Sequence, residues 1–217
     1  MSAPPPVVFY GASGYAAAIC DDRRASVVAY IDDFRGDRGD AIDGVPIVSF
    51  ETWRGSLGDV PVFVTVANPR ARRTLAERVS AAGGRFASLY HISGPIARDV
   101  IVGEGTVFGT YISIGASTVI GRHVQILSLV SIDGECVIGD FTTICPSSTI
   151  YGRVVIEEGV FVGVGARIVN EFDDPLTIGA GATIGAGAVV MRSVCPGQKL
   201  AGNPAQELRL LAAAGRM

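Results

Sequence analysis

Acid–base chemistry in this chain would rest on few side chains. The sequence has 2 histidines, His91 and His123, and imidazole is the group most often used as a general base. Two carboxylates, Asp133 and Glu135, flank Gly134. Burial raises the pKa of a carboxyl group toward neutrality and lets it accept a proton. Asp133, Glu135 and His123 are therefore the candidate bases, and the alternative for the two carboxylates is that they are solvated corner residues.

A glycine-rich turn near the N-terminus has residue types that bind phosphate. The apolar segment Val7–Tyr10 predicts a buried strand, and Gly11, Ser13, Gly14 and Tyr15 follow it ahead of an alanine-rich stretch. A strand, a glycine turn and a helix begin a Rossmann-like unit, in which the helix N-terminus receives a phosphate. The motif is imperfect, because Ser13 stands where the second glycine of G-x-G-x-x-G would be.

An acidic pair, Asp32 and Asp33, follows a second predicted strand, Val27–Ile31. Asp32 comes about 20 residues after Gly11, the spacing at which an acidic residue meets a nucleotide ribose. The alternative is a simple polar turn ahead of Arg35. The predicted elements of this region occupy about half of a dinucleotide domain. This size favours one nucleotide moiety, such as the UDP of a nucleotide sugar, over NAD.

The rest of the N-terminal region alternates strands and a helix. Pro61–Ala67 predicts a third buried strand, which Asn68 follows, and Phe86–Tyr90 predicts another strand. The helical spacing of Leu75 and Val79 predicts a helix over 70–82, with its arginines on the other, polar face. We therefore expect a Rossmann-like, nucleotide-sugar-binding domain over residues 1–92.

A six-residue repeat organises the chain from Ile96 to Ile168. Every sixth position holds an apolar, mostly β-branched residue, and glycine often follows it. The phase breaks at Asn170–Leu176 and resumes at Ile178. This period predicts a β-helix with three hexapeptides per coil, in which the apolar residue points inward and the glycine supplies a conformation that other residues resist. Ordinary antiparallel strands would instead alternate with a period of two.

Composition and charge exclude several classes of function. The formal net charge is −3 and no basic run occurs, which argues against binding to nucleic acid. The 4 cysteines show no paired metal-ligand spacing. No segment predicts a signal peptide or a membrane span, and a reducing cytoplasm is the expected setting. A helical tail is expected over 206–214, inside a β-helix domain spanning 93–217.

The domain order and one further motif carry a family resemblance. Gly202-Asn203-Pro204-Ala205 looks like the G-x-P-A motif that closes many acetyl-CoA-dependent β-helix enzymes. Over nearly its whole length the chain resembles bacterial sugar acetyltransferases of the NeuD and PglD type, which acetylate sialic acids or UDP- and GDP-linked 4-amino-4-deoxy sugars. The resemblance implies an α/β domain followed by a left-handed parallel β-helix. It also implies acetyl-CoA as co-substrate and a homotrimer that binds CoA between subunits.

The resemblance assigns site residues position by position. It places the nucleotide sugar at the glycine-rich turn and at the residues that follow the strands: Gly11, Ser13, Gly14, Tyr15, Asp32, Asp33 and Asn68. Tyr15 stands where the family usually has histidine. It places acetyl-CoA along the β-helix, at Thr143, Gly152, Val164 and Ala186.

One departure from the family changes the expected chemistry. Gly134 stands where the family has its histidine base, while Glu135, the acidic partner of that histidine, is kept. A free amine is already nucleophilic, so the loss favours an amine acceptor over a hydroxyl. His123 lies on a different corner of the predicted coil and could act only across a trimer interface. His91 is expected to be structural.

We therefore expect an acetyl-CoA-dependent N-acetyltransferase acting on a nucleotide-linked amino sugar, with UDP favoured, for the synthesis of surface-glycan precursors. A catalytically inactive relative that binds a nucleotide sugar is one alternative, and an O-acetyltransferase of the sialic-acid type is another. The β-helix carbonic anhydrases need three histidines on zinc. With 2 histidines in the chain, no metal is expected.

Overall fold

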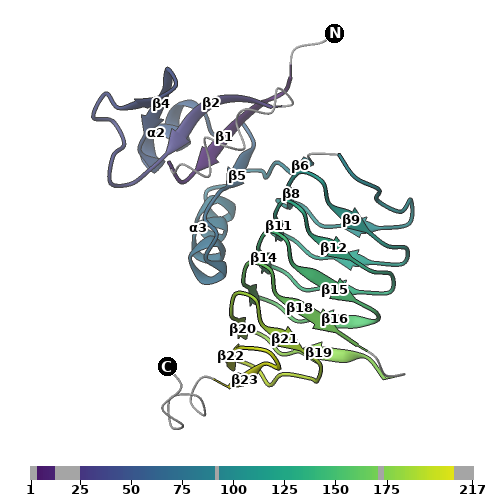
Figure 1. Cartoon of the computed structure of the whole chain (residues 1–217). Coiled ribbons are helices and arrows are strands. Elements are labelled where there is room, and N and C mark those ends of the chain that lie inside the picture. Colours follow the sequence, from purple (N-terminus) through teal and green to yellow (C-terminus); the bar gives the residue numbers. More distant parts are fainter. Residues whose placement is uncertain (1–3, 13–24, 91–92, 171–173, 208–217) are drawn as a thin grey trace. The chain divides into compact units, whose positions relative to one another are not determined.

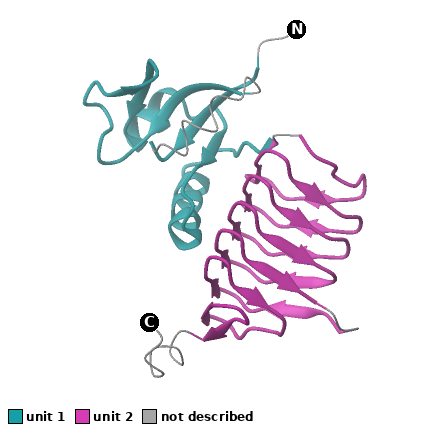
Figure 2. Ribbon diagram, viewed as in Figure 1, with its two compact units in different colours: residues 1–89 teal, residues 90–217 magenta. Residues whose placement is uncertain are grey.

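The computed structural model of the chain describes residues 4–12, 25–90, 93–170 and 174–207. The chain divides into two compact units, Met1–Leu89 and Tyr90–Met217, which Figure 2 shows in teal and magenta. The boundary predicted from the sequence fell after residue 92, and the structural division comes directly after Leu89. The first unit contains a mostly parallel sheet, and the second is built almost entirely of short strands.

The first unit is built on a five-stranded sheet of order β3-β4-β2-β1-β5 (Figure 1). Its strands are β1 (Pro6–Tyr10), β2 (Ser26–Ile31), β3 (Ala41–Ile42), β4 (Val45–Val48) and β5 (Val62–Val64). β1 pairs in parallel with β2 and β5, β2 pairs in parallel with β4, and β3 is antiparallel to β4. The carboxyl ends of the parallel strands thus share one edge, which is where open α/β sheets bind ligands.

The helix α2 (Phe50–Ser56) was not predicted from the sequence. Its 7 residues are too few for a periodic pattern, although Phe50 and Trp53 are buried on one face. The local signal is the cap, because the Ser49 side chain accepts a hydrogen bond from the Thr52 N–H. Serine is among the residues preferred at this position, where it satisfies a backbone donor that has no partner within the helix.

The helix α3 (Pro69–Ala81) agrees closely with the predicted span of 70–82. The prediction that its arginines lie on a polar face is wrong for Arg72. That side chain is 1% exposed, and its guanidinium donates hydrogen bonds to the carbonyl groups of Val66 and Ala67. A charged group is buried only when such partners satisfy it, so Arg72 fixes the loop between β5 and α3.

The second unit is a parallel β-helix, as the six-residue period predicted. Its strands are β6 (Leu89–Tyr90), β7 (Ile101–Val102), β8 (Val107–Phe108), β9 (Ser113–Ile114), β10 (Val119–Ile120), β11 (Gln125–Ile126), β12 (Ser131–Ile132), β13 (Val137–Ile138), β14 (Thr143–Ile144), β15 (Thr149–Tyr151), β16 (Val154–Ile156), β17 (Phe161–Val162), β18 (Arg167–Val169), β19 (Leu176–Ile178), β20 (Thr183–Ile184), β21 (Val189–Val190), β22 (Lys199–Ala201) and β23 (Gln206–Glu207). They form three sheets: β7-β10-β13-β16-β19, β6-β8-β11-β14-β17-β20-β22-β23, and β9-β12-β15-β18-β21. The predicted strand over Phe86–Tyr90 is corrected, since Phe86 only forms a bridge with Val62.

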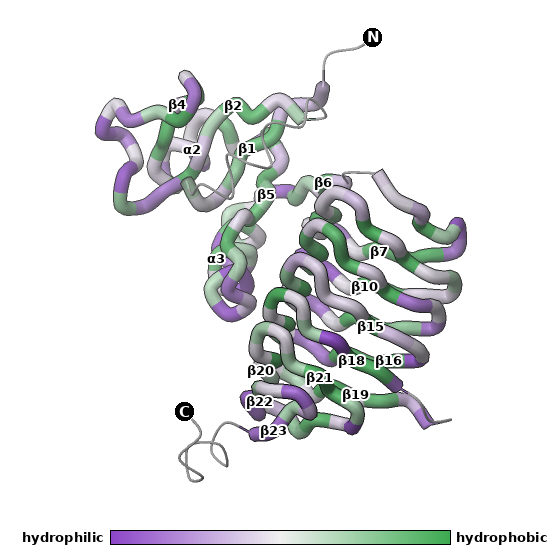
Figure 3. Tube along the Cα trace, viewed as in Figure 1, coloured by the Kyte–Doolittle hydropathy of each residue, from purple (hydrophilic) through white to green (hydrophobic). Residues whose placement is uncertain are grey.

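The register of the coils explains the core. Ile126 pairs with Ile144, and Ile132 pairs with Ile150, so each apolar residue lies on the equivalent residue of the next coil. Figure 3 shows hydrophobic residues recurring along these strands. These four isoleucines are at most 1% exposed. Fully burying a side chain of this size is worth about 1.5–3 kcal/mol, so the stacked columns supply the driving force for the coil.

The glycines that follow the core residues have a different reason from the one predicted. Gly103, Gly109 and Gly115 do not have the left-handed backbone that the sequence suggested. Instead, a Cβ on Gly115 would lie 2.7 Å from the carbonyl carbon of Asp133, on the next coil. The left-handed corner position comes two residues later and often holds a non-glycine residue, such as Ser117 with φ of 57°, although Gly105 occupies it after Gly103. These glycines are therefore required by the close stacking of coils.

The C-terminal part departs from the prediction in one element. The phase break after Ile168 is absorbed before β19, which rejoins its sheet by pairing with β16. The helix predicted over 206–214 is wrong where it can be checked, because Gln206 and Glu207 form β23, antiparallel to β22. Residues 208–217 lie outside the described part of the chain.

Candidate functional site

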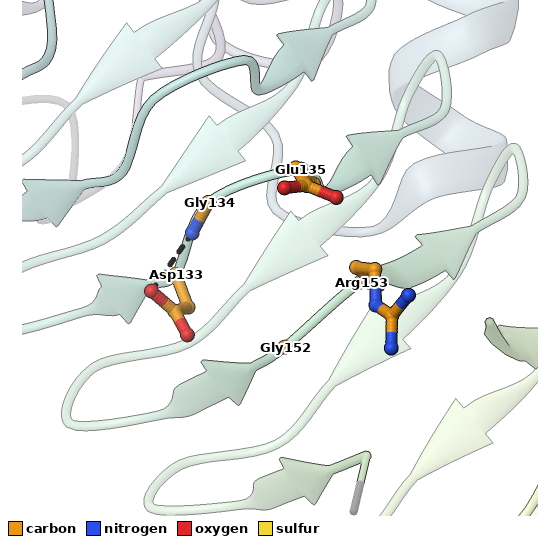
Figure 4. Close-up of a pocket in the computed structure, with 5 residues that line it drawn as sticks. All are labelled: Asp133, Gly134, Glu135, Gly152 and Arg153. Carbon is orange, nitrogen blue, oxygen red and sulfur yellow. Dashed lines mark hydrogen bonds between the residues drawn. The ribbon is translucent and has the colours of Figure 1, made fainter. Parts of the chain in front are cut away.

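The pocket nearest to the predicted chemistry lies at one corner of the β-helix, where β12 and β15 end. It has a volume of about 270 Å³ and is lined by Asp133, Gly134, Glu135, Gly152 and Arg153. Figure 4 shows the first three residues on one coil and the other two on the next. The structure therefore brings together both candidate carboxylates and one predicted CoA residue, Gly152. It adds a guanidinium that was not predicted.

Gly134 could accept a side chain at this corner if the neighbouring Ala116 carbonyl shifts slightly. It is not among the residues with a left-handed backbone, so an L-residue can adopt its conformation. A Cβ built on it would lie 3.0 Å from the Ala116 carbonyl oxygen and 3.6 Å from the Ala116 nitrogen. The Glu135 N–H donates to that same oxygen at 2.8 Å. Ala116 thus lies under the pocket, one coil before Gly134, as the repeat requires.

The two carboxylates differ in their hydrogen bonding. Asp133 accepts a bond of 2.9 Å from the Gly134 N–H through Oδ1, which orients its carboxylate beside the pocket. Glu135 sits on a left-handed backbone with φ of 58°. Both residues are exposed in the single chain, so this chain alone does not bury either carboxylate. Both carboxylates can accept a proton or bind an ammonium group.

Arg153 belongs to the pocket because of the coil register. Thr149 and Ile150 pair with Ser131 and Ile132, which puts Arg153 one coil beyond Glu135. Its backbone has φ of 21°, an uncommon conformation for a residue other than glycine. The sequence holds a signal for this residue, because Arg153 comes one full coil after Glu135 in the repeat.

Asn170 supports the wall of the pocket from the following coil. Its carboxamide nitrogen donates to the Arg153 carbonyl at 3.4 Å and to the Asp174 carbonyl at 3.0 Å. Its backbone N–H donates to the Tyr151 carbonyl at 3.0 Å, and the residue is 7% exposed. Asn170 therefore holds the backbone of Arg153 and joins it to the start of β19.

His123 lies at a different corner of the coil, as predicted. Its side chain is 5% exposed, and its ring stacks on Phe141 with centroids 4.9 Å apart and planes 12° apart. Gly105 approaches the imidazole so closely that a Cβ there would be 2.6 Å from Cε1. This packing gives His123 a structural role and does not bring it to the pocket. His91 lies outside the described residues.

The predicted CoA residues are spread over several faces. Val164 and Ala186 are exposed at neighbouring steps of another corner, where the Gly187 N–H donates to the Val164 carbonyl at 2.8 Å. Thr143 is fully buried in β14. Of the four predicted residues, only Gly152 lines the pocket. Within one chain, then, the structure does not bring these four residues together.

At the carboxyl edge of the first unit, Gly11 is fixed by its neighbours. It follows β1 with φ of 117°, and its N–H donates to the Ile31 carbonyl at 2.9 Å. The Thr65 hydroxyl donates to the Gly11 and Tyr10 carbonyl oxygens at 2.8 and 2.9 Å. A Cβ on Gly11 would lie 2.5 Å from that hydroxyl. Ser13, Gly14 and Tyr15 lie outside the described residues.

Two other predicted ligands at this edge have local structural roles. Asp32 accepts hydrogen bonds from the backbone N–H groups of Phe34 and Arg35 at 2.9 and 3.0 Å, which closes the polar turn weighed as the alternative. Asn68 caps α3 by accepting from the Ala71 N–H at 3.0 Å. Each side chain uses one oxygen in this way. Both residues lie at the end of a parallel strand or just beyond it.

Asp33 has partners that the sequence did not reveal. Its Oδ2 accepts from Arg78 Nη1 at 2.6 Å and from the Tyr10 hydroxyl at 2.9 Å. The Arg78 guanidinium also lies 3.9 Å above the centre of the Phe50 ring. Burial and then the hydrogen bond to Asp33 raise the pKa of Tyr10 well above its usual value. Tyr10 and Arg78 are 68 residues apart, so no local signal could have joined them.

In the described part of the chain, no group of three or more histidine, cysteine, aspartate or glutamate residues is placed to hold a metal ion. Within the same residues, no helix combines the length and the apolar character needed to cross a membrane.

Comparison with known proteins gives the chain its relatives. No protein-family model matches it. GDP-perosamine N-acetyltransferase of Escherichia coli O157:H7 is 37% identical over 149 residues, which are 67% of this chain and 66% of that protein. UDP-3-O-acylglucosamine N-acyltransferase of Methylorubrum extorquens is 33% identical over 113 residues, and the chain spans only 26% of that protein.

Solved structures match over almost the whole chain. PerB of Caulobacter crescentus, in complex with CoA and GDP-perosamine, has a TM-score of 0.83 and 28% identity, covering 93% of this chain and 96% of its own. The acetyltransferase domain of PglB from Neisseria gonorrhoeae, in complex with acetyl coenzyme A, has a TM-score of 0.81 and 25% identity, covering 94% and 99%. By its repeat, its two units and these likenesses, the chain belongs to the hexapeptide-repeat sugar N-acetyltransferases.

Proposed function

We propose that the protein transfers the acetyl group of acetyl-CoA to the amine of a nucleotide-linked amino sugar. The observation that carries this proposal is the pocket lined by Asp133 and Glu135 on either side of Gly134. The likeness to proteins solved with CoA and GDP-perosamine, or with acetyl coenzyme A, supports both substrates. The whole-chain match supports the same order of a nucleotide-sugar unit and an acyl-transfer unit.

The reaction follows from the chemistry of the two substrates. The unprotonated amine of the sugar attacks the thioester carbonyl, forming a C–N bond and a tetrahedral intermediate. Collapse of this intermediate breaks the C–S bond, and the electron pair leaves with the CoA sulfur. The amine must lose a proton along this path. Asp133 or Glu135 accepts it, and the CoA thiolate takes up one proton to leave as the thiol.

With glycine at position 134, the site has no imidazole base there, but its other residues remain. A general base typically contributes about 10² to 10⁴ in rate, whereas holding two reactants together can contribute several kcal/mol by itself. A histidine-to-alanine variant of the Caulobacter crescentus GDP-perosamine N-acetyltransferase has also been solved with CoA and GDP-perosamine. Loss of a histidine in that protein thus leaves both ligands bound, which supports substrate binding here without one.

The nucleotide of the acceptor is the finer part of the proposal. The small size of the first unit favoured UDP, but two relatives are named for GDP-perosamine or bound to it. We take a GDP-linked amino sugar as the first candidate and a UDP-linked one as the second. The Asp33–Arg78–Tyr10 cluster and Gly11 lie at the strand edge where this nucleotide would bind.

The proposed assembly is a homotrimer of left-handed β-helices with CoA between neighbouring subunits. Asp133 and Glu135 are exposed in the single chain, and the predicted CoA positions Gly152 and Val164 lie on different corners. A second subunit would cover the carboxylates and bring a different corner to the pocket. Burial of this kind is what raises the pKa of a carboxylate enough for it to act as a base.

The test is release of free thiol from acetyl-CoA, with GDP-, UDP- and dTDP-linked amino sugars as acceptors and the matching neutral sugars as controls. Release with one amino sugar and none with its neutral counterpart is the expected result. A protein that binds a nucleotide sugar but releases no thiol with any acceptor would instead be the inactive binding relative, which Gly134 favours as the second candidate. A protein that does not bind CoA would refute the proposal that acetyl-CoA is the donor and, with it, the proposed reaction.

A further inference from the structure

We propose that Arg153 binds the sugar-linked phosphate of the acceptor while Asp133 and Glu135 bind its ammonium group, so that the pocket selects a sugar carrying both charges. This inference rests on the proposed function and deepens it, because it assigns the orientation of the acceptor in the pocket. It starts from the charges in the pocket. Among the described residues that line it, two are acidic and one is basic.

The coil register sets the separation of these charges. Glu135 and Arg153 occupy equivalent corner positions on neighbouring coils, and neighbouring parallel strands lie about 4.8 Å apart. Figure 4 shows Arg153 on the coil next to Glu135, with Asp133 on the other side of Gly134. The pocket thus takes its acidic side chains from one coil and its basic side chain from the next.

A nucleotide-linked 4-amino sugar has a matching distribution of charge. Its amine and its glycosidic oxygen are attached to opposite carbons of one six-membered ring, so an ammonium and a phosphate stand at the two ends of the sugar. Ionised carboxylates only accept hydrogen bonds and suit the ammonium. A guanidinium presents a planar fork of donors that suits phosphate. The phosphates of CoA are far from its thiol. The phosphate attached to the sugar is therefore closer to the reacting atoms than any phosphate of CoA.

Asn170 makes this placement of Arg153 specific. Arg153 has φ of 21°, a conformation that residues other than glycine adopt only where their surroundings hold it. The Asn170 carboxamide donates to the Arg153 carbonyl at 3.4 Å, and Asn170 itself is tied to the Tyr151 carbonyl at 3.0 Å. Asn170 is thus a positioning residue, which holds the backbone from which the guanidinium extends.

The test is equilibrium binding, measured by calorimetry on the full chain, and it needs no turnover. GDP-perosamine carries both charges, and GDP-mannose lacks the ammonium; UDP-linked counterparts form a second pair. Arg153→Gln should weaken binding of both members of a pair by about 10-fold or more, because a charge-assisted bond is lost. Arg153→Lys should recover part of that loss. Glu135→Gln should weaken binding of the amino sugar alone.

The matched control is Arg167→Gln, which removes an exposed arginine from β18 without touching the pocket. Thermal melting and CoA binding establish that each variant is folded. Arg153→Gln binding both sugars as tightly as Arg167→Gln would overturn the inference, and so would a wild-type chain that binds none of them. A wild-type chain that binds the amino sugar but releases no thiol refutes the proposed reaction, while the binding series still decides the role of Arg153.

Discussion

Replacing Gly134 by histidine should convert the pocket into one with a nitrogen base. The residue does not use a left-handed backbone, and a Cβ would meet the Ala116 carbonyl oxygen at 3.0 Å. That oxygen must move by a few tenths of an ångström. Replacing a glycine at a compatible position stabilises a protein by about 0.4–1 kcal/mol through the unfolded state. We therefore expect the net change in stability to stay within about 1 kcal/mol, or about 2–4 °C in Tm.

The effect on the reaction should be much larger. Glu135 is adjacent to the new side chain and can act as the acidic partner of the imidazole. A positioned general base is worth about 10² to 10⁴ in rate, so the Gly134→His variant should release thiol faster by this factor at saturating substrates. Its pH–rate profile should gain a limb near pH 6.5, the usual pKa of histidine.

Two controls separate the base from the bulk of the side chain. Gly134→Phe places a ring at the same position without a proton acceptor and should show no gain in rate. Adding Glu135→Gln to Gly134→His should remove part of the gain. The reasoning is refuted if Gly134→His is folded, binds CoA and the amino sugar like the wild type, and still releases thiol no faster than the wild type.

Three further outcomes concern stability. Gly11→Ala should destabilise the first unit by about 1–3 kcal/mol in urea unfolding, more than Gly39→Ala, which is also left-handed but has no atom within 4 Å of the added Cβ. Burial and the acidic neighbour Asp33 raise the pKa of Tyr10, so the folded state resists ionisation of this phenol. The stability of the wild type should therefore fall as the pH rises above about 10. The stability of Tyr10→Phe should fall less steeply over the same range. Burial acts to raise the pKa of Asp140, but hydrogen bonds from Arg122 lower it overall. The contribution of these bonds to folding stability should be lost as the pH falls below about 4. Asp140→Asn should therefore reduce the loss of thermal stability at acidic pH.

The β-helix could be predicted from the sequence because an apolar, mostly β-branched residue recurs at every sixth position. Every third of these residues falls in one column, as Ile126 and Ile144 do. The glycines were located correctly but explained wrongly. Gly115 is needed because the next coil approaches its Cα, and a close approach between coils leaves no mark that distinguishes it from a left-handed turn.

The N-terminal site could be predicted only in part, because its side chains meet across the fold. Asp33 was expected at a ligand, and its position after β2 fits that expectation. Its bond to Arg78 joins residues 45 positions apart. α2 was missed because one turn of apolar spacing, from Phe50 to Trp53, is too short to distinguish from a loop.

The pocket itself shows why the carboxylates alone do not decide between enzyme and binding protein. Asp133 and Glu135 are exposed, so this chain alone does not exclude water from either carboxylate. A neighbouring subunit and a bound sugar would each exclude water from them, so the same residues can bind an ammonium in the free chain and accept its proton in the closed complex. Binding then depends on the charges of the pocket, which are the two carboxylates and the Arg153 guanidinium. Turnover depends in addition on the subunit or sugar that covers the carboxylates. The two activities are therefore separable by experiment, and the presence of glycine at position 134 bears directly only on the second.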